Sequence, residues 1–251
     1  MIKVLLSGAC GKMGTAVTRC SKEDEEIKIV AGVDRAEVLC EYKIFKSFDD
    51  VNVDADVIID FSNVSVLDSL LEFAVKNNTP IILATTGYNE MQIEQIKAAA
   101  HKISVFYTAN MSLGVNLLLS LAKYAAKILG SDFDVEIVEK HHSQKLDAPS
   151  GTALMLANAI NDVFDDKYHY EYDRHSKRQK RSKNEIGIHA VRGGTIVGEH
   201  DIIFAGHDEV ITLSHAAQSK EVFAAGALKA AKFIYGKPNG LYNMGDILNL
   251  G

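Results

Sequence analysis

The sequence is poor in cysteine, has no long uninterrupted apolar run and carries no surplus of positive charge. Its three cysteines, Cys10, Cys20 and Cys40, are an odd number with no C-x-x-C pair, which argues against a disulfide framework and a cysteine zinc site. We therefore expect a reducing, cytoplasmic compartment. No apolar run approaches the roughly 20 residues of a membrane span, and the N-terminal run is too short for a signal peptide. Neither membrane insertion nor secretion is expected.

Acidic residues outnumber basic ones. The net charge is −6, from 27 Lys and Arg against 33 Asp and Glu, which argues against a dedicated nucleic-acid binder. What the chain does contain is typical of a globular protein: 251 residues, 47% hydrophobic and 24% charged. This length suffices for one large domain or two small ones, with a core that needs no cross-link.

One local exception to the acidic character is the segment 174–183, with six Lys and Arg in ten residues. Blocks of like charge repel and stay solvated, so an exposed loop is the first interpretation. An anion-attracting flank beside a binding cleft is the second. Nucleic-acid binding is the third, because the chain as a whole is acidic.

The first hundred residues alternate between short apolar strands and helical patterns. Strands are expected at 2–7, 27–33, 56–61, 81–84 and 103–107, and helices at 12–20, 64–77 and 89–102. Continuous apolar strands separated by helices indicate a parallel sheet covered on both faces. The sequence therefore predicts an α/β fold class, with a Rossmann-like, doubly wound domain in this half.

After residue 112 the pattern changes. Helices are expected at 115–129 and 150–164 and a strand at 133–140, and three strand-like runs then follow between residues 185 and 217 without a helix. This order predicts a mixed-sheet α+β domain with some antiparallel pairing. A final helix at 220–235 is expected to return to the first domain. We predict a dinucleotide-binding domain at 1–112 and 220–251, and a substrate-binding and oligomerisation domain at 113–219.

A glycine-rich loop opens the chain, between the first strand and the first helix. Gly8, Gly11 and Gly14 form a G-x-x-G-x-x-G spacing, which allows a tight turn and the approach of a pyrophosphate to a helix N-terminus. The spacing departs from G-x-G-x-x-G, so the interpretation as a phosphate-binding loop rests on its position between a strand and a helix. An ordinary glycine turn is the alternative.

Other candidate cofactor residues follow later strands. Asp34 ends the second strand, where a carboxylate binds the adenosine ribose of NADH, and Arg35 beside it can pair with the 2′-phosphate of NADPH. This pair leaves the preference between NADH and NADPH open, with a surface ion pair as the alternative. Two polar loops, 84–87 and 108–111, also lie at the carboxyl ends of strands, where ligands of open α/β sheets bind.

The segment 139–153, EKHHSQKLDAPSGTA, is the richest in reactive groups. His141 or His142 can act as a general acid near neutral pH, and Lys145 can bind a carboxylate or donate a proton. The amides of Ser150, Gly151 and Thr152 at a helix N-terminus form a carboxylate site. Together these groups suit a small anionic substrate, with a structural turn carrying surface histidines as the alternative.

A metal site is not expected. The later histidines, His189, His200, His207 and His215, lack the spacing of metal ligands, and no cysteine or carboxylate completes a compact set with them.

The histidine–lysine segment resembles the signature of the 4-hydroxy-tetrahydrodipicolinate reductase (dihydrodipicolinate reductase) family, E-x-H-H-x-x-K-x-D-A-P-S-G-T-A, at every position. The segments SGACGKMG, ATTGY, TANMSLGVN and RGGTIVGEH are also similar to family segments, in the same order. The chain departs at Ala84, where the family more often has glycine, and at Asn63, where it can have arginine.

The resemblance implies a Rossmann cofactor domain, a mixed α/β substrate domain and a homotetramer, with a small dicarboxylate as substrate and NADH or NADPH as cofactor. It implies His141 as the catalytic acid or base and Lys145 as the proton donor, with His142, Gly151 and Thr152 holding the substrate carboxylates. The residues implied to line the cofactor are Gly8, Ala9, Cys10, Gly11, Lys12, Met13, Asp34, Arg35, Ala84, Thr85, Thr86, Thr108, Ala109, Asn110 and Met111.

The implied reaction is the NAD(P)H-dependent reduction of (2S,4S)-4-hydroxy-2,3,4,5-tetrahydrodipicolinate to (S)-2,3,4,5-tetrahydrodipicolinate with loss of water, in lysine and diaminopimelate biosynthesis. Two alternatives stay open from the residues. One is another Rossmann dehydrogenase acting on a small dicarboxylate or imino acid. The other is a non-catalytic NAD(P)-sensing protein, which would need neither His141 nor Lys145.

Overall fold

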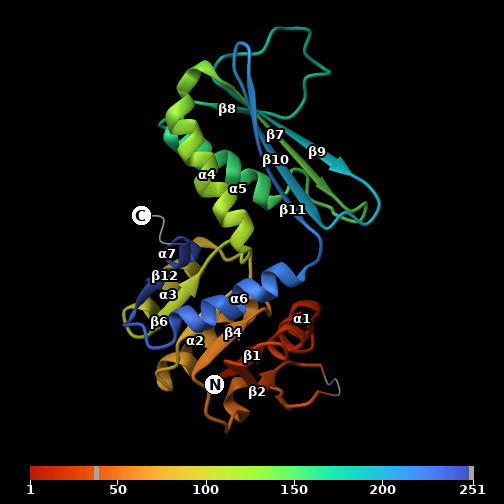
Figure 1. The fold of residues 1–251 in the computed structure, drawn as a ribbon. Coiled ribbons are helices and arrows are strands. Elements are labelled where there is room, and N and C mark those ends of the chain that lie inside the picture. Colours follow the sequence, from red (N-terminus) through yellow and green to blue (C-terminus); the bar gives the residue numbers. More distant parts are fainter. Residues whose placement is uncertain (37–39, 249–251) are drawn as a thin grey trace. The chain divides into compact units, whose positions relative to one another are not determined.

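The computed structural model describes residues 1–36 and 40–248, and it divides the chain into two compact units (Figure 1). Unit 1 comprises Met1–Leu113 and Lys220–Gly251, and unit 2 comprises Gly114–Ser219. The fold class is confirmed, because unit 1 is built on a parallel sheet and unit 2 on a separate mixed sheet.

Unit 1 contains a seven-stranded sheet in which every neighbouring pair of strands is parallel. Its strands are β1 (Ile2–Ser7), β2 (Ile27–Val33), β3 (Lys43–Phe45), β4 (Val57–Asp60), β5 (Ile81–Leu83), β6 (Ser104–Tyr107) and β12 (Gly240–Tyr242). The order is β12-β6-β5-β4-β1-β2-β3, so the direction of winding reverses between β1 and β4. The loops after these two strands therefore border the crevice where open α/β sheets bind ligands.

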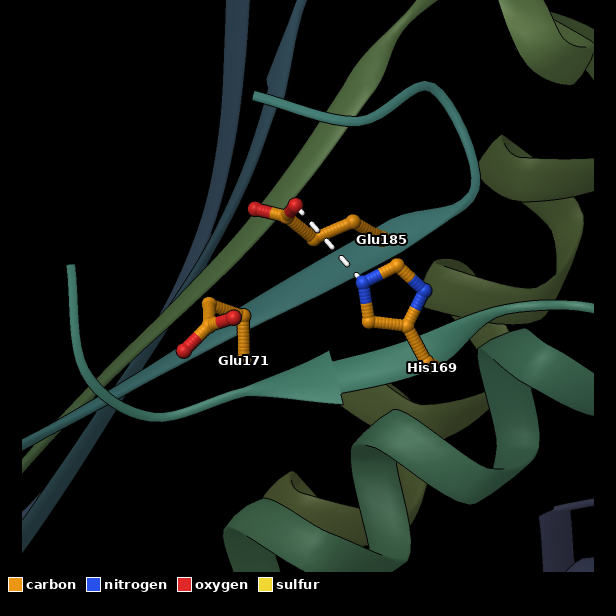
Figure 2. A group of neighbouring side chains, drawn as sticks. All are labelled: His169, Glu171 and Glu185. Atoms are coloured by element: carbon orange, nitrogen blue, oxygen red, sulfur yellow. Dashed lines mark ion pairs between the residues drawn. The ribbon is translucent and has the colours of Figure 1, made fainter. Parts of the chain in front are cut away.

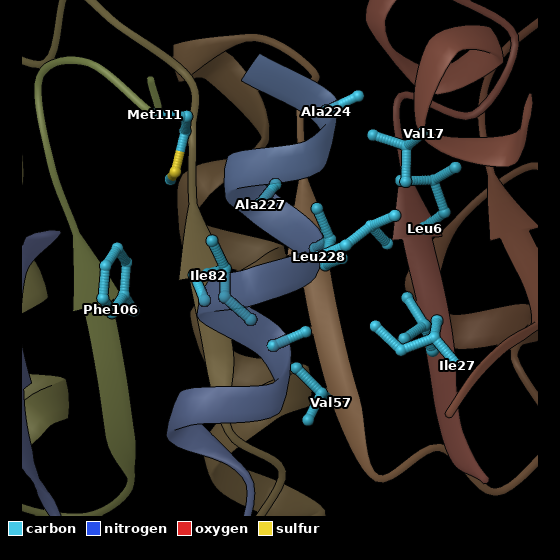
Figure 3. Packing of buried hydrophobic residues seen from close by; sticks show 14 of the residues in the cluster. Leu6, Val17, Ile27, Val57, Ile82, Phe106, Met111, Ala224, Ala227 and Leu228 are labelled. Carbon is cyan, nitrogen blue, oxygen red and sulfur yellow. The ribbon is translucent and has the colours of Figure 1, made fainter. Parts of the chain in front are cut away.

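Helices cover both faces of this sheet, as the apolar strands require. The helices of unit 1 are α1 (Lys12–Ser21), α2 (Leu67–Lys76), α3 (Glu90–Ala100), α6 (Glu221–Ile234) and α7 (Met244–Leu248). Along β1, Val4 and Leu6 join the core under α1 and α6, whereas Leu5 joins the core under α2 and α3. Figure 3 shows how α6, through Ala227 and Leu228, packs against the first of these faces.

Unit 2 contains a mixed five-stranded sheet with the order β11-β10-β7-β9-β8. Its strands are β7 (Asp134–His141), β8 (His169–Glu171), β9 (Glu185–Arg192), β10 (Gly198–Ala205) and β11 (Val210–Ala217). Strand β7 is antiparallel to β10 and parallel to β9. Helices α4 (Leu113–Leu129) and α5 (Gly151–Val163) share one core with the sheet, in which Leu118 and Leu156 pack with Ile137 and Phe204.

Helix α4 corrects one expectation. Residues Leu113–Asp132 are long and apolar enough to cross a membrane, with a mean hydropathy of 1.3, and 22% of that window is buried. The sequence analysis counted uninterrupted apolar residues and missed this stretch, because Lys123 and Lys127 interrupt the run without lowering its mean below that of a spanning helix. The buried side of α4 belongs to the core of unit 2, and core helices of water-soluble domains pass the same test.

Candidate functional site

Two hollows adjoin at the crevice of unit 1. The larger, about 690 Å³, is lined by residues from the loops after β1, β2 and β4, including Gly8, Asp34 and Arg35. The smaller, about 290 Å³, is lined by the loops after β4 and β5. Both are bordered by Phe61, Ser62 and Asn63, so they are continuous along the end of β4. Their position is where dinucleotides bind in doubly wound sheets.

The backbone of the first loop meets the requirements of a phosphate-binding turn. Gly8 has a φ of +76°, and a Cβ there would lie 2.5 Å from the carbonyl oxygen of Phe61. A Cβ at Gly14 would lie 2.3 Å from the carbonyl oxygen of Gly8. Only glycine fits at either position without a shift of the backbone, and α1 begins directly after Gly11. The loop therefore fits the pyrophosphate of a dinucleotide.

Asp34 fastens the glycine loop to the end of β2. Its two carboxylate oxygens accept hydrogen bonds from the backbone N–H groups of Cys10 and Ala36, each at 2.9 Å. Asp34 and Arg35 both line the larger hollow, as predicted, and Lys46 lines it beside them. The sequence analysis missed Lys46 because it follows β3, a strand of only three residues.

The smaller hollow contains all three residues predicted at the end of β5, Ala84, Thr85 and Thr86. The Thr85 hydroxyl donates to the carboxylate of Asp60 at 2.6 Å, and the Ser62 hydroxyl donates to the same carboxylate at 2.5 Å. Asp60 is fully buried, and this burial raises the pKa of its carboxyl group. The missed residue Asp60 thus joins the loops after β4 and β5, and its place at a strand end was the available signal.

The other predicted cofactor residues have different surroundings. The side chains of Ala9 and Met111 are buried in the core under α6 (Figure 3 shows Met111), so only their backbone atoms remain for a ligand. The amide of Cys10 is bound to Asp34. Five more predicted residues border neither hollow: two lie at the start of α1 and three in the loop after β6, where the Thr108 hydroxyl donates to the Asn110 carbonyl. These are Lys12, Met13, Thr108, Ala109 and Asn110.

In unit 2, a buried hydrogen-bond network surrounds His141 at the end of β7. His141 and Glu139 are two residues apart on the strand and so share its buried face. The Nδ1 atom of His141 is 2.6 Å from Oε2 of Glu139, which is 0% exposed. Arg192 donates to both carboxylate oxygens of Glu139, at 2.7 Å each. His141 is thus held by the buried carboxylate that Arg192 also binds.

Lys145 and His142 lie in the turn that follows β7. The Lys145 ammonium is 2.8 Å from Oδ1 of Asp147, and its side chain is one-fifth exposed. The pKa of Asp147 is held below its usual range by this ammonium. The carbonyl of His142 accepts the backbone N–H of Lys145 at 3.1 Å, which closes the turn. The cation is therefore held at the surface of the same segment as His141.

The N-terminus of α5 differs from the expectation at Ser150. The Ser150 amide is not free, because it donates to Oε1 of Glu139 at 2.9 Å. The Ser150 hydroxyl caps the helix by accepting the amide of Ala153 at 3.2 Å, and the side chain is buried. Gly151 and Thr152, at the first two helical positions, are the predicted residues that stay next to solvent. Sequence alone could not show which of the three amides a buried carboxylate would take.

His200 is a site residue that the sequence analysis did not identify as one. It lies opposite Glu139 in the β7–β10 ladder, and its ring meets that of His141 edge-on, with centroids 5.3 Å apart. Its Nε2 is 3.1 Å from the Ser150 hydroxyl. Burial and the neighbouring His141 lower the pKa of His200 to about 4. His200 is therefore neutral at neutral pH and does not compete with His141 for a proton.

Among the described residues, one group of three potential metal ligands comes together away from these sites: His169, Glu171 and Glu185 (Figure 2). The His169 Nε2 is 3.8 Å from Glu185 Oε2. Both carboxylates already bind cations, Glu171 that of Lys177 and Glu185 that of Arg174. We therefore interpret the group as ion pairs, not as a metal site.

The basic segment 174–183 is only partly the solvated loop expected. Arg174, Lys177 and Arg181 fold back on acidic residues of the sheet, and Arg181 contacts both Glu136 and Asp134, at 3.0 and 2.8 Å. The exposed cations that remain are Arg178, Lys180 and Lys183. The sequence analysis treated the block in isolation, whereas its partners lie on the flanking strands β8 and β9 and on β7, which is distant in the sequence.

Comparisons with known proteins agree along the whole chain. The family model described as dihydrodipicolinate reductase, N-terminus, matches residues 2–111, and the one described as dihydrodipicolinate reductase, C-terminus, matches residues 114–248. A 4-hydroxy-tetrahydrodipicolinate reductase of Caldanaerobacter subterraneus subsp. tengcongensis is 52% identical over 251 residues, with 100% of each chain covered. One of Clostridium tetani is 49% identical over 250 residues, covering 99% of this chain and 98% of the relative.

Two solved structures superpose over nearly the whole chain. A dipicolinate-bound dihydrodipicolinate reductase from Paenisporosarcina sp. TG-14 superposes with a TM-score of 0.82 at 26% identity, with 99% of each chain covered. An aspartate dehydrogenase from Thermotoga maritima superposes with a TM-score of 0.54 at 15% identity, covering 95% of this chain and 98% of that one, and shares the fold alone.

Proposed function

Because this chain belongs to the dihydrodipicolinate reductase family, we propose that His141 and Lys145 supply the protons of its reaction. The chain is an NAD(P)H-dependent oxidoreductase that reduces (2S,4S)-4-hydroxy-2,3,4,5-tetrahydrodipicolinate to (S)-2,3,4,5-tetrahydrodipicolinate with loss of water, in lysine and diaminopimelate biosynthesis. The single observation that supports the assignment of these residues is the hydrogen bond from His141 to buried Glu139, in the same segment as the Lys145 ammonium.

Unit 1 is proposed as the dinucleotide-binding domain and unit 2 as the substrate-binding and oligomerisation domain. The glycine loop and the residues at the ends of β2 and β5 would hold NADH or NADPH, because they line the two hollows of unit 1. The reduced nicotinamide, when bound, supplies the hydride. The turn after β7 and the start of α5 would hold the substrate, because cations and helix amides suit its two carboxylates.

The chemistry needs two protonations. The leaving hydroxyl must take a proton to depart as water, and the neighbouring ring carbon gives up a proton, which forms the conjugated imine. When the hydride reaches this imine, charge builds on the ring nitrogen and the neighbouring carbon, and the ring takes a second proton, so the net uptake is one hydride and one proton. We assign the first to Nε2 of His141, and the second to the Lys145 ammonium. His142, Gly151 and Thr152 are assigned to the substrate carboxylates, with Gly151 and Thr152 at the amide end of α5.

Steady-state oxidation of NADH and NADPH tests this function directly. The substrate is generated in the cuvette from pyruvate and aspartate semialdehyde by the preceding synthase. Oxidation that depends on the synthase is the expected result. Nucleotide binding without oxidation would contradict the reaction and favour another dicarboxylate or imino-acid substrate, or a sensing role.

We expect Asp34→Ala to weaken NADH binding more than NADPH binding, because a carboxylate accepts hydrogen bonds from a free ribose 2′-hydroxyl but repels a 2′-phosphate. Both affinities should fall somewhat, since the same carboxylate fastens the glycine loop. The measurement is the Kd of each nucleotide by fluorescence titration. Arg35→Ala is the matched variant with the opposite preference, and equal losses for the two nucleotides in Asp34→Ala would place Asp34 away from the ribose.

We also propose that the chain is a cytoplasmic homotetramer. The surface of unit 2 supports self-association: Leu117, Leu121, Tyr124 and Ile128 form an exposed apolar stripe at helical spacing on α4. Sedimentation should give a mass about four times that of one chain, and Leu121→Glu with Tyr124→Glu should give a smaller species. A wild-type chain that sediments as a monomer would contradict the proposal.

A further inference from the structure

The network around His141 contains a residue whose place suggests a specific task, Glu139. It is fully buried at the end of β7, where no water can solvate its carboxylate. Two N–H groups of Arg192 and the backbone N–H of Ser150 donate to it instead, and Nδ1 of His141 lies 2.6 Å from its Oε2. Burial alone would raise the pKa of Glu139, but Arg192, His141 and the Ser150 amide together hold it below its usual range. Glu139 is therefore an ionised carboxylate at neutral pH.

An ionised carboxylate can accept hydrogen bonds but has no proton to donate. The short contact at 2.6 Å therefore requires the proton to sit on Nδ1 of His141. This fixes the tautomer, so that Nε2 is the nitrogen that gains and loses a proton. Within the part of the chain that the structure describes, Nε2 makes no hydrogen bond, and a Cβ at Gly198 would lie 3.0 Å from it. The missing side chain of Gly198 leaves room at the reactive nitrogen.

Glu139 also connects the other parts of the site. Through the Ser150 amide it contacts the first turn of α5. Through Arg192 it reaches the loop of Lys145, because Arg192 donates to the backbone carbonyl of Asp147 at 2.7 Å. One carboxylate thus orients the imidazole and contacts both the anion-binding helix end and the segment that bears the ammonium.

The other charged and titratable groups near His141 do not displace Glu139 as the partner of its imidazole. Glu139 lies on the same strand, Arg192 on β9 and His200 on β10, and Lys145 pairs with Asp147 in the adjoining loop. His200 is neutral near pH 7 because burial lowers its pKa to about 4. Arg192 is already bound to Glu139. Glu139 is thus the anion in direct contact with the imidazole.

We propose that Glu139 is the positioning residue of the reaction: it holds the Nδ1–H of His141 and directs Nε2 to the substrate. The proposal rests on the role assigned above to His141 and extends it to a residue that does not touch the substrate. In Glu139→Gln, the carboxamide keeps the shape but offers an NH₂ group as well as an oxygen. An NH₂ facing Nδ1 makes that atom an acceptor and moves the proton to Nε2.

The expected result for Glu139→Gln is a kcat lower by roughly 10²-fold or more, the scale of a displaced acid or base, with little change in the substrate KM and none in nucleotide Kd. Two-bond ¹H–¹⁵N correlations of labelled histidine should report Nδ1–H for neutral His141 in the wild type and Nε2–H in the variant. Glu139→Asp keeps the charge and should recover part of kcat.

Glu136→Gln is the matched control. Glu136 lies three residues earlier on β7, also accepts a histidine at 2.8 Å and also pairs with two arginines, but on the other face of the strand. The variant Glu136→Gln should leave kcat unchanged. This control separates the loss of an ion-pair network on β7 from the loss of the contact with His141.

Several results would overturn the proposal. An Nε2–H tautomer in the wild type would do so even if every Glu139 variant failed to fold, because the spectrum of the unaltered protein is enough. Unchanged kcat in folded Glu139→Gln, or a lower kcat with Nδ1–H retained, would reduce Glu139 to a structural role. Failure of the reductase assay in the wild type would instead contradict the proposed function and leave the tautomer measurement intact.

Discussion

Lys145→Ala is expected to lower kcat by roughly 10²- to 10⁴-fold, the usual scale for a positioned proton donor, while the Kd for the dinucleotide stays the same. The Lys145 side chain is one-fifth exposed and its ammonium is paired with Asp147 at the surface of unit 2, so it is placed to meet a ligand. The hollows proposed for the dinucleotide are lined by residues of unit 1 alone, which is why nucleotide binding should survive.

Steady-state kinetics measures kcat, and fluorescence titration of the nucleotide measures its Kd. Lys167→Ala is the matched control, because Lys167 belongs to the same unit and pairs with Asp165 at 2.9 Å in an exposed ion pair. Unchanged turnover in Lys145→Ala, with the control also active, would assign the second proton to water or another group.

His141→Ala is the second large effect that we expect, a loss of roughly 10²- to 10⁴-fold in kcat. The reason is that water must leave the substrate before the hydride can arrive, and a neutral hydroxyl is a poor leaving group. The variant also leaves Glu139 buried with one partner fewer, which costs stability. His141→Asn keeps a polar group at the position. This second variant distinguishes a loss of catalysis from a defect in folding.

Kinetics at saturating nucleotide, with thermal unfolding of each variant, completes this test. His207→Ala serves as its control, since His207 is almost fully exposed in unit 2 and pairs with its neighbour Asp208. A loss below tenfold in both His141 variants would mean that His141 is not the acid.

Strands and helices with strong patterns could be predicted from the sequence, and most of the short ones could not. The three-residue β5 is the exception, because Pro80 introduces its apolar run. Strands β1 and β2 begin and end at the expected residues, because each is a long apolar run between turn signals. Three strands of three residues, β3, β8 and β12, were missed, along with the five-residue α7. So short a segment has no detectable periodicity, and what makes it a strand is an existing sheet edge beside it.

The candidate site shows the same division. Glycines, histidines and the lysine were identifiable because motif spacing is local in the chain. Glu139 belongs to the quoted motif, yet its role depends on Arg192, which lies 53 residues away. His200 was dismissed for want of metal-ligand spacing, although its neighbourhood is set by strand register. Such pairings depend on the fold of the sheet, which no local pattern contains.

The buried ionisable groups give the two units opposite responses to acid. His200 has a pKa of about 4 when folded against 6.5 otherwise, so between these values the unfolded chain binds more protons and the free energy of unfolding drops as the pH falls. This loss amounts to about 3 kcal/mol once the pH is below 4. The lowered pKa of Glu139 acts in the same direction at lower pH, below the usual value of a glutamate.

In unit 1 the buried ionisable group Asp60 has the opposite effect on the free energy of unfolding as the pH falls. The pKa of Asp60 is raised by burial, so the folded state binds the proton more tightly, and its protonation relieves a buried charge as the pH falls. Through these groups, acid is expected to lower the free energy of unfolding of unit 2 relative to that of unit 1. Hydrogen exchange of the backbone amides during acidification would then show unit 2 opening before unit 1, without a protease or a truncation.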